Sequence, residues 1–98
     1  MKKPKRYVRQ QFIDAVSKMT GNESFQRRVM NAWSEVHVLT PADFDDLELR
    51  EHYEFIARSR VTLDSTDEEC EEVRKRIVEI FLELEMKSLV PDVPSTKG

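Results

Sequence analysis

Apolar residues recur along the first third of the chain at spacings of three and four, the spacing of one face of an α-helix. The first such stretch runs from Lys5 to about Met19 and stops at Thr20-Gly21-Asn22. A second stretch, in which Trp33 is the expected core anchor, runs from Glu23 to about Val36. The glycine between them suits the end of a helix, and the sequence therefore predicts two helices joined by a short turn.

The clearest local signal is Thr40-Pro41-Ala42-Asp43, in which Thr40 caps a helix, Pro41 occupies its first position and Asp43 reaches back to the cap. It predicts a third helix from Pro41 to about Arg60. A helix with two apolar sides is expected to be central in a bundle, or to contact a partner with its second side. The two sides are Phe44, Leu47 and Phe55, and Leu49, Tyr53, Ile56 and Ala57.

The fourth helix is expected from about Asp67 to Ser88, after a capping box formed by Ser65 with Glu68 or by Thr66 with Glu69. The fold class is therefore all-α, a compact and mostly antiparallel bundle of about four helices with the third helix central. Residues 1–90 are expected to form one domain. Residues 91–98, which contain two prolines, are expected to be a disordered tail.

Composition narrows the function classes. The chain has 98 residues, two glycines and one cysteine, so it is too short for two domains and too poor in turn residues for an all-β fold. With no possible internal disulfide, no signal peptide and no run of roughly 20 apolar residues, a cytoplasmic protein is expected.

The candidate reactive groups do not point to catalysis. Cys70 lies on the apolar stripe of an acidic helix start, where burial and neighbouring carboxylates would blunt a thiol. His37 and His52 lack zinc-ligand spacing, and phosphate loops and nucleophile elbows are absent from the sequence. We therefore expect no enzyme, no cofactor and no metal.

The net charge of −3 is unevenly distributed. Residues 1–30 carry eight Lys/Arg and two Asp/Glu, whereas residues 31–98 carry eight Lys/Arg and seventeen Asp/Glu. This asymmetry can steer an anionic partner to one end, or it can draw helices or subunits of the protein together. The candidate nucleic-acid-binding residues are Lys2, Lys3, Lys5, Arg6, Arg9, Arg27 and Arg28.

The acidic residues of the third helix are the alternative binding surface. Such runs are commonly solvated helix faces, but they can also dock on a basic protein site, including one that normally binds DNA. The candidate protein-binding residues are Asp43, Asp46, Glu48, Glu51 and Glu54. The two apolar sides of the same helix make a homo-oligomer a further prediction.

One segment has a resemblance to a known family. Residues 39–48, LTPADFDDLE, continuing through Tyr53, Ala57 and Arg58, resemble a helix of phage small terminase subunits, and Trp33 resembles a tryptophan that precedes that helix. The resemblance implies an oligomeric DNA-recognition subunit of a packaging motor. The sequence thus predicts a small non-catalytic binding module, regulatory or adaptor in kind, with a protein or a nucleic acid as its partner. The alternative is a DNA-binding subunit that uses the basic N-terminal third.

Overall fold

The computed structural model describes residues 3–89, which contain four α-helices, one 3-10 turn and no strand. The predicted all-α fold class is therefore confirmed. The tail predicted for residues 91–98 lies outside the described part of the chain. The elements are α1 (Lys5–Lys18), α2 (Phe25–Val36), η1 (Pro41–Asp43), α3 (Leu47–Arg58) and α4 (Asp67–Leu89).

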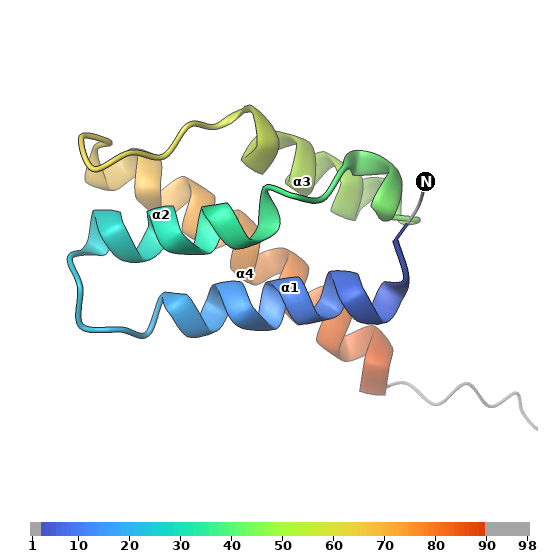
Figure 1. Cartoon of the computed structure of the whole chain (residues 1–98). Helices are drawn as coiled ribbons and strands as arrows, with labels where there is room; N and C mark the ends of the chain where they lie inside the picture. The colour runs from blue at the N-terminus through green and yellow to red at the C-terminus, as the bar shows by residue number, and fades with distance from the viewer. Residues whose placement is uncertain (1–2, 90–98) are drawn as a thin grey trace, which may run out of the picture.

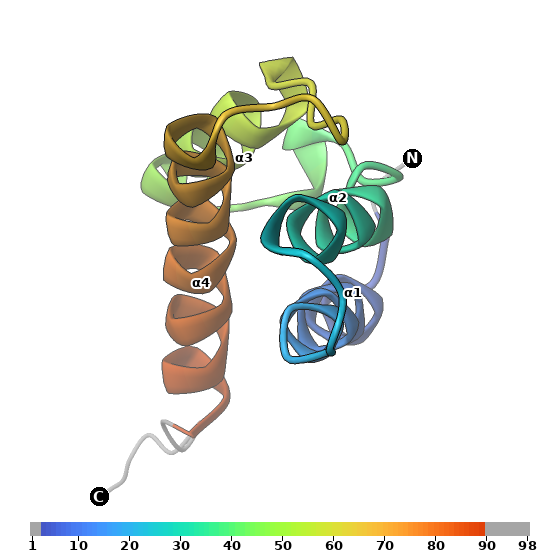
Figure 2. The same cartoon turned by 90° about the vertical axis from the view of Figure 1, so that its left-hand side faces the viewer.

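The helices α1 and α2 form an antiparallel pair, and the longest helix, α4, crosses behind both of them (Figure 1). Turned by 90°, α4 stands on one side of the molecule, the α1–α2 pair on the other, and α3 lies across the top (Figure 2). Only α4 packs extensively against each of the three other helices. The central helix is therefore α4, and the prediction that the third helix is central was wrong.

The core is built from the predicted stripes, because the buried apolar residues of each long helix repeat at spacings of three and four. Helix α4 has 23 residues and is the longest of the four, so it is long enough to contact each of the other helices. The buried residues are Val8, Phe12 and Ala15 in α1, Val29, Ala32 and Val36 in α2, Leu49, Tyr53 and Ile56 in α3, and Cys70, Val73, Ile77 and Ile80 in α4.

The start of the third helix differs from the prediction. The Thr40–Asp43 capping box forms, but it caps only the short turn η1, and the backbone is extended at Phe44. Phe44 is buried against Phe12 and Tyr53, with ring centroids 6.1 and 5.0 Å away, so the chain bends there to place this ring in the core. Helix α3 then begins at Leu47 with its own N-cap. The predicted continuous third helix with two apolar sides is therefore not formed, because Phe44 lies outside α3.

The other capping box forms as the sequence allowed. Thr66 N–H donates to Glu69 Oε1 at 2.9 Å, and Glu69 N–H donates to Thr66 Oγ1 at 3.1 Å. Of the two alternatives, the structure therefore has Thr66 with Glu69, and α4 begins at Asp67 as predicted.

Trp33 is half-buried and does not lie at the centre of the core. Its indole Nε1–H donates to the Ile56 carbonyl oxygen at 3.0 Å, and its ring lies 4.4 Å from that of His37. Its role is to join α2 to α3, because the indole combines an apolar ring with a polar N–H edge. None of the helices within residues 3–89 has both the length and the apolar content needed to cross a bilayer.

Candidate functional site

Four basic side chains of residues 3–18 form ion pairs with acidic residues from later elements. Lys18 Nζ, for example, lies 3.7 Å from Glu35 Oε2 of α2. The charge asymmetry of the sequence thus draws parts of the same chain together, which was one of its two interpretations. The other three pairs are Lys3 with Asp43 (Nζ to Oδ2, 3.5 Å), Lys5 with Asp45 (Nζ to Oδ2, 3.6 Å) and Arg9 with Glu85 (Nε to Oε2, 2.8 Å, and Nη2 to Oε1, 3.1 Å).

Arg28 is occupied in a different way. Its Nη1 donates to the Met19 carbonyl oxygen at 3.0 Å and its Nε to the Glu23 carbonyl oxygen at 3.1 Å. Its guanidinium also lies 5.7 Å from the centre of the Phe25 ring. Arg28, which the sequence made a candidate for binding nucleic acid, therefore closes the turn between α1 and α2.

Arg6 and Arg27 are exposed and lie in the first turns of α1 and α2. Because these helices run antiparallel, their first turns are at opposite ends of the molecule (Figure 1). Lys2 lies outside the described residues. The structure therefore does not gather the candidate nucleic-acid-binding residues into one basic surface.

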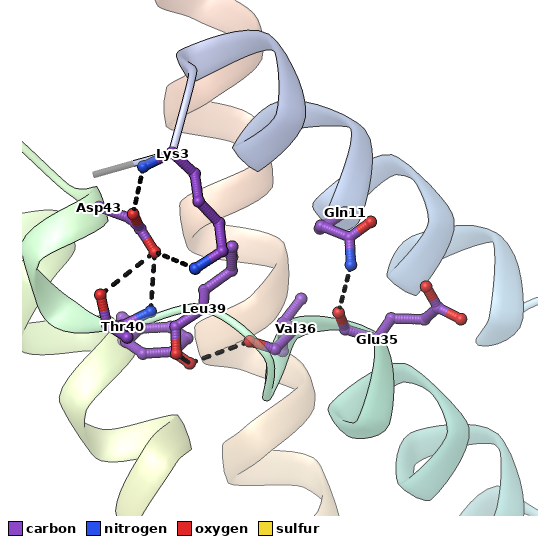
Figure 3. A network of polar contacts seen from close by, with 8 residues as sticks. Lys3, Gln11, Glu35, Val36, Leu39, Thr40 and Asp43 are labelled. Carbon is purple, nitrogen blue, oxygen red and sulfur yellow. Dashed lines mark hydrogen bonds and ion pairs between the residues drawn. The ribbon is translucent and has the colours of Figure 1, made fainter. Parts of the chain in front are cut away.

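Asp43, a candidate protein-binding residue, is only 5% exposed. Its Oδ1 accepts the Lys3 backbone N–H at 2.8 Å, and its Oδ2 accepts the Thr40 N–H at 2.9 Å and the Thr40 hydroxyl at 3.3 Å (Figure 3). Burial is the largest influence on the Asp43 pKa and raises it, but these hydrogen bonds and the Lys3 charge together hold the pKa below its ordinary value. Asp43 therefore belongs to the interior, and its place on a docking surface was wrong.

Tyr53 contributes to the same polar region from α3. Its hydroxyl lies 2.5 Å from the Leu39 carbonyl oxygen and 2.9 Å from that of Val36, at the end of α2. Burial, with the nearby negative charge of Asp43, raises the Tyr53 pKa to about 12. The hydroxyl is thus a neutral donor that holds α3 against the α2–η1 connection. The sequence pattern places Tyr53 on an apolar side of the third helix and does not indicate this role.

Asp46 also has a structural task. It is the N-cap of α3, with Oδ1 accepting the Glu48 N–H at 2.8 Å, and its Oδ2 accepts Lys87 Nζ at 3.1 Å. The hydrogen bond from Lys87 is the main reason that the Asp46 pKa lies below its ordinary value. The carboxylate joins the start of α3 to the last turns of α4, and so it is not free for a partner.

The remaining three candidates do form one surface. Glu48, Glu51 and Glu54 follow each other at spacings of three on α3, and all three are exposed. None of them has a cationic partner among the described residues. Leu47, which precedes Glu48 at the start of α3, is 64% exposed. We call Glu48, Glu51 and Glu54 the α3 acidic face.

The groups considered for chemistry lie apart. Cys70 is buried, as predicted, and burial followed by the charges of Asp67 and Glu69 raises its pKa. The His37 ring contacts that of Trp33 at an interplanar angle of 39°, whereas His52 Nδ1 lies 3.1 Å from Arg76 Nη1. Within the described part of the chain, no three His, Cys, Asp or Glu side chains are grouped so that they could hold a metal ion.

A shallow open groove, which sequence analysis did not foresee, lies where α2 and α4 begin. Phe25 lines it together with Lys75 and four acidic side chains. Two of these acids are paired with cations and a third accepts a hydrogen bond from a neutral amide, so about half of the negative charge of the groove is compensated. The contacts are Asp67 with Gln26, Glu71 with Arg74, and Glu72 with Lys75.

Comparisons of the sequence and structure with family models, curated proteins and solved structures give no match.

Proposed function

We propose that this protein is a small non-catalytic binding module, regulatory or adaptor in kind, which presents the α3 acidic face to a basic surface of a protein partner. The observation that carries the proposal is the uncompensated charge of this face. In the described residues, three glutamates project from one helix without a cation, although most basic residues of the N-terminal segment are paired with acids elsewhere. Complementary charge steers such an encounter and selects the partner.

A protein partner is favoured over a nucleic acid because of where the cations lie. Binding to a phosphate backbone requires several lysines or arginines along one surface. Here Lys3, Lys5 and Arg9 are paired with carboxylates, and the exposed Arg6 and Arg27 are at opposite ends of the α1–α2 pair. The DNA-binding alternative, similar to a phage small terminase subunit, would first have to break those pairs.

A different protein is favoured over a second copy through the same face. If two α3 helices met in antiparallel order about the middle of the face, Glu48 would lie opposite Glu54 of the second copy and Glu51 opposite its own equivalent. In parallel order each glutamate would meet its own equivalent. Like charges directly opposite each other are destabilising, so a basic partner is needed. The homo-oligomer predicted from a two-faced third helix loses this basis, because Phe44 is buried outside the helix.

The exposed Leu47 supplies an apolar contact beside the carboxylates. One face of a twelve-residue helix is small compared with a stable protein interface of roughly 1,600 Å², so a transient complex is expected. Charge-driven attraction at an exposed face is screened by salt. The proposed complex should therefore weaken steeply as ionic strength increases.

The test is affinity purification from the native host with three forms of the full chain. These are the wild type, the variant Glu48→Gln/Glu51→Gln/Glu54→Gln, and a matched control that loses the same charge elsewhere, Glu68→Gln/Glu79→Gln/Glu83→Gln. Circular dichroism establishes that all three are folded. Both protein and nucleic acid are identified in each eluate.

We expect one protein to be recovered with the wild type and the control, to be lost with the α3 variant, and to be released by salt. Equal recovery with the α3 variant would contradict the proposal. A fourth form, Arg6→Gln/Arg27→Gln, tests the alternative: nucleic acid recovered with the wild type and lost with this variant would support DNA binding.

A further inference from the structure

We draw no further inference here: the strongest candidate, the apolar stripe of Val78, Leu82 and Met86 along the outer side of α4, carries no proposal because nothing in the structure shows what covers it.

Discussion

Lys3 and Asp43, forty positions apart in the sequence, are joined by two contacts. The backbone N–H of Lys3 donates to Asp43 Oδ1 at 2.8 Å, and its ammonium lies 3.5 Å from Oδ2. Together with the two bonds from Thr40, they surround the one buried charged side chain of the described residues (Figure 3). This arrangement fastens the segment before α1 to the turn η1, and it makes Asp43 the most informative residue for a stability experiment.

Replacement of Asp43 by asparagine should destabilise the fold by about 1–3 kcal/mol, because hydrogen bonds to a buried charged group are costly to lose. The amide nitrogen of Asn would face donors on Lys3 or Thr40 and could not accept from them. Urea denaturation measures the change in the free energy of unfolding. Asp45→Asn is the matched control, since Asp45 is exposed and the side chain of Lys5, with which it forms an ion pair, is 86% exposed. This variant should change stability by less than about 1 kcal/mol. Equal effects of the two variants would show that Asp43 has no special role.

Acid should destabilise the protein partly through Asp43. Its pKa in the folded state lies below the ordinary value of 3.8, so its stabilising contribution is complete above that value and is lost as pH falls through the folded pKa. The free energy of unfolding, measured in urea at a series of pH values below about 5, should therefore decrease. The decrease should be shallower in Asp43→Asn, which has no carboxyl to protonate. If the wild type and Asp43→Asn lose stability in parallel, other acidic residues cause the loss of stability at low pH.

Removal of the Tyr53 hydroxyl should also destabilise the protein. Tyr53→Phe keeps the ring but leaves the carbonyl oxygens of Val36 and Leu39 without this donor, at a cost of about 1–2 kcal/mol. Thermal and urea denaturation report the change. Tyr7→Phe is the control, because Tyr7 is 41% exposed and its hydroxyl makes no hydrogen bond within the described residues. A stable Tyr53→Phe variant would mean that the hydroxyl contributes little.

The central position of α4 predicts a sharp contrast between its two sides. Ile77 is fully buried, so Ile77→Ala should cost about 2–5 kcal/mol through lost burial and a residual cavity. Leu82, five positions later, is 51% exposed, and Leu82→Ala should change stability by less than about 0.5 kcal/mol. Denaturant midpoints of the two variants measure the contrast. A large loss of stability in Leu82→Ala would show that Leu82 lies in an interface and not on a free surface.

The sequence alone determined the helices, because helix formation depends on local features. The three-and-four spacing of apolar residues, the Thr66–Glu69 capping box and the break at Gly21 all act over a few positions. They placed α1, α2 and α4 within about two residues of their observed ends. The burial of Cys70 also followed from its place on a stripe.

The tertiary structure decided how the helices and charges are used, because those choices depend on residues that are distant in sequence. Phe44 left the helical pattern to pack on Phe12 and Tyr53, and this shortened the predicted third helix. Asp43 can be an interior residue because Lys3, forty positions earlier in the chain, donates a hydrogen bond to it. A periodic pattern shows which face of a helix is apolar, but not which element covers that face or which charge neutralises another. For this reason only the packed structure shows that α4 is central. It also reduces the five candidate acids to the three of the α3 acidic face.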